Sequence, residues 1–76
     1  MRDGAYQKFR VLLADARQKA DLTQAQLSLR LNRPQSFVSK YERGERRLDV
    51  VEFGEVARAL GIDPIRLLAK LYRDLP

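Results

Sequence analysis

The sequence predicts an all-α fold with five short helices. Apolar residues recur at intervals of three and four through most of the chain, which is the spacing of one helix face. Cap-forming residues separate these segments, and no window alternates polar and apolar residues for long enough to predict a strand. With 76 residues and no repeat or linker, the chain is expected to be one domain (1–76) with its core between residues 6 and 72.

The first two predicted helices have recognisable ends. One helix is expected over residues 3–19. Its apolar face consists of Tyr6, Phe9, Leu12, Leu13 and Ala16. Asp21 follows as a residue that tolerates a positive φ. A second helix begins at Thr23, because Gln26 three residues later completes a capping box, and it ends at Asn32, which favours the left-handed conformation.

A third short helix is expected between Pro34 and Gly44. Proline suits the first turn of a helix because its φ is fixed and its missing amide is not needed there. Phe37, Val38 and Tyr41 mark the buried face of this helix. Because the connection from the preceding helix is only about three residues, the pair forms a helix-turn-helix, whose second helix stands out from the body of the domain.

Two further helices follow a charged loop. Asp49 and Glu52 form a capping pair at the start of the fourth helix, and Gly61 ends it. The inner face of this helix is expected to contain Val50, Phe53, Ala57 and Leu60. Asp63 and Pro64 then open a fifth helix, which is expected to run to about residue 72.

Composition excludes several classes of function. The longest apolar run, residues 11–14, is too short to span a membrane or to form a signal peptide, and the chain has no cysteine. We therefore expect a soluble, cytoplasmic protein without a metal or cofactor. The chain also lacks histidine, and its serines lie near no evident base, so no nucleophilic triad is available and an enzyme is not expected.

The net charge of +5 is concentrated in one stretch. Residues 30–47 contain six basic and two acidic side chains, so they carry +4 of this total. Such a stretch is either a solvated basic face or a contact surface for nucleic acid.

Three motifs with defined spacing favour the contact surface for nucleic acid. They are LTQ at residues 22–24, QSFVSKYERGER at 35–46 and ALG at 59–61. Together they closely resemble the phage-repressor/Cro-like (XRE) family of helix-turn-helix regulators. The resemblance covers about residues 6–70. It implies a compact, five-helix, lambda-repressor-like fold and a transcriptional regulator that binds double-stranded DNA sequence-specifically.

The chain departs from the family pattern at three positions. Asp21 and Asn32 stand where many members have glycine, and both residue types can still adopt a positive φ. Gly54 stands inside the fourth helix, where the family usually has a large apolar residue. It is either a tolerated local weakness or a position explained by close packing or by a partner.

The resemblance makes the third helix the recognition helix, whose exposed residues would enter the DNA major groove. Gln35 comes first, and its amide suits adenine N6 and N7. Lys40 would donate to guanine or neutralise a phosphate. Ser36 and Ser39 share this face, and each is either a base contact or a solvated helix residue.

Phosphate contacts are expected around the recognition helix. Gln24, in the first turn of the second helix, matches a family residue that bonds a DNA phosphate, although it is also an ordinary exposed helix residue by type. The other predicted phosphate-binding residues are Arg33, Arg43, Arg46 and Arg47. Arg17 and Glu42 match family positions that pair across the base of the recognition helix, which implies a structural salt bridge.

The fifth helix is apolar over more than one face. Its predicted interface residues are Ile65, Leu68, Leu71 and Tyr72. Family members often dimerise through their C-terminal helices, which implies a homodimer with two recognition helices about 34 Å apart on a pseudopalindromic site. The alternative is a protein partner on this helix, which would make the chain an antitoxin-like or adaptor protein.

Overall fold

The computed structural model describes residues 2–74, and these residues form helices and connecting turns without a strand. The helices are α1 (Arg2–Lys19), α2 (Gln24–Arg30), α3 (Phe37–Glu42), α4 (Val50–Leu60) and α5 (Pro64–Arg73). The predicted all-α fold is confirmed. Within residues 2–74, every helix is too short or too polar to span a lipid bilayer.

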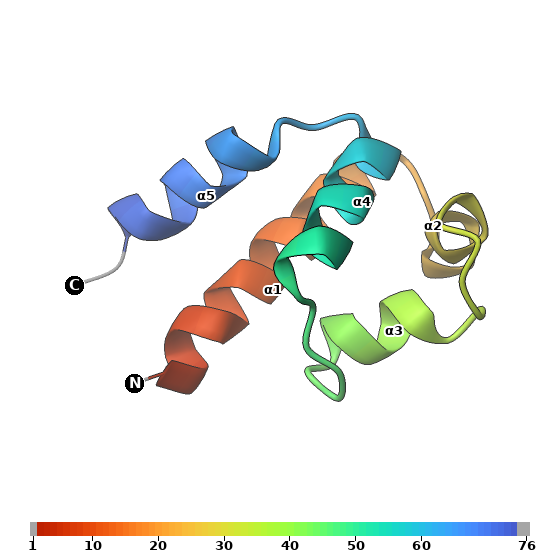
Figure 1. Ribbon diagram of the computed structural model, residues 1–76, viewed down its shortest axis with the longest axis horizontal. Helices are drawn as coiled ribbons and strands as arrows, with labels where there is room; N and C mark the ends of the chain where they lie inside the picture. The colour runs from red at the N-terminus through yellow and green to blue at the C-terminus, as the bar shows by residue number, and fades with distance from the viewer. Residues whose placement is uncertain (1, 75–76) are drawn as a thin grey trace.

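The five helices pack around a common core. α1 contacts α3 and α5, while α4 contacts α2 and α5. Figure 1 shows α2 and α3 at the end of the molecule opposite the two termini. The buried residues of the core are Phe9, Leu13, Leu27, Phe37, Val38, Tyr41, Phe53, Val56, Leu60, Leu67 and Leu71. Because every helix contributes to it, α2 and α3 are fixed to the body of the molecule by apolar contacts as well as by polar ones.

The helix ends follow the predicted chemistry. Thr23 accepts a hydrogen bond from the Gln26 amide, and the Gln26 side chain accepts one from the Thr23 amide, so the capping box is confirmed. Asp49 opens α4 with a second capping box, also as predicted. Asp21 and Asn32 have φ values of 60° and 56°, which confirms that both occupy the left-handed region that glycine usually fills.

Two predicted details are wrong. α3 begins at Phe37, not at Pro34, because residues 35 and 36 form a turn in which the Phe37 amide bonds the Pro34 carbonyl. Val50 was expected on the inner face of α4 but is 79% exposed, whereas Val56 is buried. Val50 is the first residue of α4 and lies at the rim of the core, whereas Phe53, Ala57 and Leu60 of the predicted face are buried.

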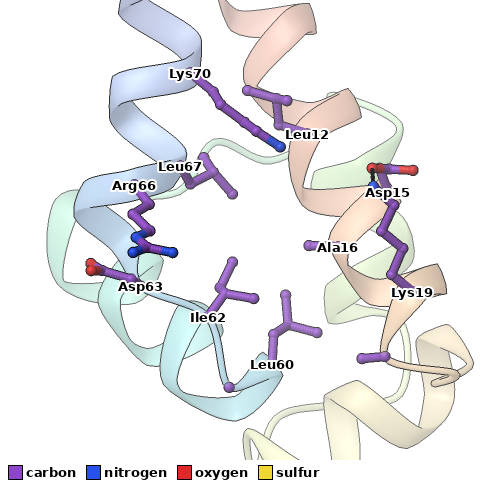
Figure 2. Close-up of a pocket in the computed structure, with 12 residues that line it drawn as sticks. Leu12, Asp15, Ala16, Lys19, Leu60, Ile62, Asp63, Arg66, Leu67 and Lys70 are labelled. Atoms are coloured by element: carbon purple, nitrogen blue, oxygen red, sulfur yellow. Dashed lines mark ion pairs between the residues drawn. The ribbon is translucent and has the colours of Figure 1, made fainter.

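A groove of about 720 Å³ lies between α1 and α5 (Figure 2). Leu12 and Ala16 of α1 line one side, and Ile62 and Leu67 line the other. The long side chain of Lys70 extends across its upper part in Figure 2. No residue of α2 or α3 lines this groove, so it is separate from the helix-turn-helix.

Candidate nucleic-acid interface

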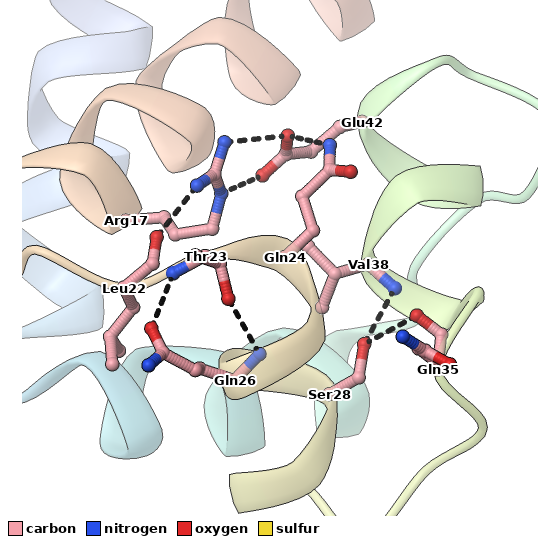
Figure 3. A network of polar contacts seen from close by, with 9 residues as sticks. All are labelled: Arg17, Leu22, Thr23, Gln24, Gln26, Ser28, Gln35, Val38 and Glu42. Carbon is pink, nitrogen blue, oxygen red and sulfur yellow. Dashed lines mark hydrogen bonds and ion pairs between the residues drawn. The ribbon is translucent and has the colours of Figure 1, made fainter.

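A buried serine joins the two helices of the helix-turn-helix. Ser28 is fully buried in α2, and its hydroxyl donates to the Gln35 carbonyl at 3.2 Å and accepts from the Val38 amide at 3.2 Å (Figure 3). Ser36, the residue before α3, makes no side-chain cap bond. Ser28 therefore satisfies a free amide in the first turn of α3 from a neighbouring helix, and in doing so fixes the turn that carries Gln35.

The Glu42 carboxylate at the end of α3 is held by two neighbouring elements. Arg17 of α1 donates to it through Nε at 2.7 Å and Nη2 at 3.2 Å, and Gln24 donates through Nε2 at 2.8 Å (Figure 3). Arg17 also bonds the Leu22 carbonyl at 2.7 Å. With side-chain exposures of 12% for Arg17 and 9% for Glu42, this is a largely buried pair that connects α1, α2 and α3.

Arg10 of α1 contacts the last turn of α3. Its Nη1 donates to the Glu42 carbonyl at 2.9 Å, which satisfies one of the carbonyls that a helix end leaves free. The guanidinium lies against Gly44, where an added Cβ would come within 2.9 Å of Arg10 Cζ. Gly44 also has a φ of 81°. Glycine at this position therefore permits both the backbone path and the approach of Arg10.

The loop after α3 is attached to the first turns of α1. The Tyr6 hydroxyl accepts a hydrogen bond from the Leu48 amide at 2.8 Å. The Arg47 guanidinium lies 4.2 Å from the centre of the Tyr6 ring, a cation–π distance. Tyr6 thus fixes both the backbone and one basic side chain of this loop.

Arg33 and Arg46 lie on the ring of Phe37, the first residue of α3. Their guanidinium carbons are 4.8 and 5.0 Å from the ring centre. Arg46 also donates to both Glu52 carboxylate oxygens, at 2.9 and 2.7 Å. These bonds, together with one from the Asp49 amide, hold the pKa of the Glu52 carboxyl at about 2. Arg33 also lies 3.5 Å from Glu52, so two predicted phosphate-binding arginines have an acidic partner in the same chain.

The predicted base-reading residues lie at one exposed surface. The side chains of Gln35, Ser36 and Lys40 are exposed, whereas Ser39 is half-buried and its hydroxyl donates to the Ser36 carbonyl at 3.0 Å. Gln35 lies in the turn before α3 and not on the helix itself. The opposite face of α3 is buried, so this polar surface points away from the core.

The remaining predicted phosphate contacts differ in their surroundings. Arg43 is exposed and pairs with Glu45, from Nε to Oε2 at 2.8 Å, which lowers the pKa of the Glu45 carboxyl. Exposed pairs of this kind are weak and exchange readily with other ions. Gln24 is half-buried and bonds Glu42 through its side-chain amide. That nitrogen carries a second hydrogen, so one donor remains.

Three of the four predicted interface residues on α5 have the spacing of one helix face, and the fourth, Leu71, faces the core. Ile65 and Tyr72 are exposed, Leu68 is half-buried, and Leu71 is only 8% exposed. Leu71 belongs to the core together with Leu67, because these two residues lie one turn apart on the side of α5 that faces the other helices. The apolar surface that α5 offers to a partner is therefore smaller than predicted.

Several residues that position α3 could not be predicted from the sequence. The sequence carries only a weak signal that Ser28 is buried: it is a small polar residue directly after a core leucine in a short helix. The sequence carries no signal for the hydrogen bonds of Arg10 and Tyr6, because their partners lie 32 and 42 residues away along the chain. Glu52 was identified as a capping residue, but its pairing with Arg46 was not.

A short helix with a buried inner face, a polar outer face and a fixed turn to the helix before it defines a helix-turn-helix DNA-binding protein. The helix-turn-helix family model matches residues 13–67 of this chain. The solved structure of an XRE-family like protein from Pseudomonas syringae pv. tomato str. DC3000 is similar, with 51% identity and a TM-score of 0.93. The match covers 99% of this chain and 92% of that one.

The chain belongs to the XRE family of helix-turn-helix proteins and is a DNA-binding transcription regulator. No curated protein matches the sequence.

Proposed function

We propose that this regulator reads a specific sequence of double-stranded DNA with the surface formed by Gln35, Ser36, Ser39 and Lys40. The observation that carries the proposal is the contrast between the two faces of α3. Its inner face is buried and tied to α1 and α2, so its outer polar side chains are presented on a rigid support. A rigid helix of this size fits the major groove, where base edges differ in their donors and acceptors.

Gln35 is the main determinant of sequence in this proposal. It lies in the turn directly before α3, and its side chain is exposed. Its amide both donates and accepts, which matches adenine N7 and N6. Ser36 adds a small donor beside it, and Lys40, exposed one turn further along, contacts a guanine or a phosphate.

Arg43 and Arg47 are the proposed phosphate contacts after α3, and Gln24 is the contact before it. Arg43 exchanges its exposed pair with Glu45 for a phosphate. Arg47 is exposed and lies on the Tyr6 ring in the loop after α3. Such contacts release counterions, so binding should weaken with salt at a slope of about −0.9 for each phosphate neutralised.

A homodimer is the proposed binding form, on a pseudopalindromic site whose halves lie about 34 Å apart. Ile65 and Tyr72, which are 70% and 63% exposed on α5, support a contact with a second chain. Sedimentation at micromolar concentration tests this. A dimer is expected, and a monomer would instead favour the alternative in which α5 binds a different protein.

Selection of bound duplexes from a random pool tests sequence reading directly. We expect one enriched motif for the wild-type protein and a changed motif for Gln35→Ala. Gln7→Ala is the matched control, because Gln7 is an exposed glutamine on α1 outside the proposed surface. If no motif is enriched, or if both variants retain the wild-type motif, Gln35 does not read the sequence.

A further inference from the structure

The ring of Phe37 is contacted by two arginines, one before and one after α3 in the sequence. Arg33 precedes α3, Arg46 follows it, and both guanidiniums lie within 5.0 Å of the ring centre. Phe37 itself is only 6% exposed. The first residue of the recognition helix is therefore contacted by two side chains that lie outside that helix.

Both arginines are anchored to α4 by carboxylates. Arg46 makes a two-pronged contact with Glu52, at 2.7 and 2.9 Å, and Arg33 lies 3.5 Å from Glu52 and 3.5 Å from Glu55. The Glu52 side chain is 12% exposed and also accepts the Asp49 amide at 3.1 Å. Two cations thus face two anions, and this cluster has no net charge with which to attract a phosphate.

We infer that Arg33 and Arg46 are positioning residues that set the orientation of α3, with Glu52 as their shared anchor, and that they are not phosphate contacts. The inference rests on the proposed function, since it concerns how the same surface reads DNA. It reassigns two residues that charge alone places on the DNA backbone. Arg43 and Arg47 then supply the phosphate contacts on the C-terminal side of α3.

The geometry explains why this anchor matters for reading sequence. Gln35 and Ser36 come directly before Phe37, so a shift of the Phe37 backbone moves both base-reading side chains. Hydrogen bonds to base edges require tight distances and angles. Loss of the anchor is therefore expected to weaken discrimination between sequences before it weakens attraction to DNA in general.

The test compares Arg46→Gln with Arg47→Gln in the full chain. For each, we would measure the affinity for the selected duplex, the affinity for an unrelated duplex and the dependence of both on salt. Arg46→Gln should lower the ratio of specific to non-specific affinity on the order of tenfold and leave the salt slope unchanged. Arg47→Gln should reduce the slope by about 0.9 and leave the ratio nearly unchanged.

Two results would overturn the inference. One is a reduced salt slope in Arg46→Gln, which would make Arg46 a phosphate contact. The other is a lower melting temperature with an unchanged affinity ratio, which would make its role purely structural. If the wild-type protein itself binds no duplex more tightly than another, the proposed function fails, and this outcome is separate from both.

Glu52→Gln gives a second test that does not remove either arginine. Glutamine keeps the capping bond to the Asp49 amide but removes the charge that holds Arg33 and Arg46. We expect a lower affinity ratio and a steeper salt slope, because the released arginines become available to phosphates. A variant that folds and shows neither change contradicts the inference, and this variant remains informative if Arg46→Gln does not fold.

Discussion

At the scale of single residues, the hydroxyl of Ser28 takes the place of a side-chain N-cap for α3. It lies in a different helix from the amide it satisfies, and it also bonds the Gln35 carbonyl. Ser28→Ala removes both bonds and leaves the buried Val38 amide without a partner. We expect a loss of about 1–3 kcal/mol in the free energy of unfolding, measured by denaturant titration.

Ser36→Ala is the matched control for this prediction. Ser36 is an exposed serine that makes no cap bond, so its replacement should change the free energy of unfolding by less than about 0.5 kcal/mol. Equal effects of the two substitutions would show that the Ser28 bonds contribute little.

Gly44 allows a second residue-scale prediction. Alanine there must adopt a φ of 81° and meets Arg10 Cζ at 2.9 Å, so Arg10 has to release the Glu42 carbonyl. Gly61→Ala is the matched control, because its φ of 71° imposes a similar backbone cost and an added Cβ meets no atom within 4 Å. Gly44→Ala should be the more destabilising by about 1 kcal/mol in thermal or denaturant unfolding. Equal losses would mean that Arg10 adds nothing to stability.

At the scale of elements, the Arg17–Glu42 pair connects three helices. Arg17→Ala leaves the Glu42 carboxylate and the Leu22 carbonyl without that donor in a largely buried position. We expect a loss of about 3 kcal/mol in the free energy of unfolding. Lys19→Ala breaks an exposed pair with Asp15 and should cost less than about 0.5 kcal/mol. An unchanged stability of Arg17→Ala would contradict the structural assignment.

Gly54 offers a stabilising change. It lies inside α4, and an added Cβ would meet no atom within 4 Å. Gly54→Ala should therefore stabilise the folded protein by about 0.5–1 kcal/mol, because alanine restricts the unfolded chain and favours the helix. The reverse change, Ala69→Gly at an exposed position in α5, should destabilise by a similar amount. Destabilisation by Gly54→Ala would indicate that this position needs to stay small.

The helix ends show what local sequence can predict. The capping boxes at Thr23 and Asp49 depend on residues three positions apart, and both were predicted correctly. The start of α3 was not, because residues 35 and 36 form a turn that Ser28 contacts from another helix. The prediction that Val50 lies on the inner face of α4 was wrong for a related reason. Periodicity identifies a helix face but not where the elements that cover it end.

At the scale of the whole molecule, stability should depend on pH through Glu52. Its carboxyl has a pKa of about 2 in the folded protein, against an ordinary value of 4.5, so the folded state binds a proton there less readily than the unfolded state does. The stabilisation is complete above about pH 4.5 and is lost as the pH falls towards 2. Glu52→Gln should show a shallower loss of stability over this range in denaturant titrations. An identical acid dependence in both proteins would contradict the assignment.

The site was harder to predict than the fold for a physical reason. The exposure of Lys40 opposite the buried residues of α3 follows from helix periodicity, which is a local property, whereas Gln35 and Ser36 lie in the turn before the helix. Whether an arginine meets a phosphate or a carboxylate depends on distances that the complete fold sets. Arg46 is six residues from Glu52, yet only the path of the intervening loop brings them to 2.7 Å.

The contacts between α1 and the region of α3 also determine the order in which the protein can fold. α3 has six residues, too few to be stable as an isolated helix. Its supports on α1 span 25 residues from Arg17 to Glu42 and 42 residues from Tyr6 to Leu48. During synthesis, which proceeds from the N-terminus, the bond from Arg17 can form only after Glu42 has emerged, and the bond to Tyr6 only after Leu48 has emerged. A nascent chain that ends before Leu48 therefore lacks the support that Tyr6 gives to the loop after α3.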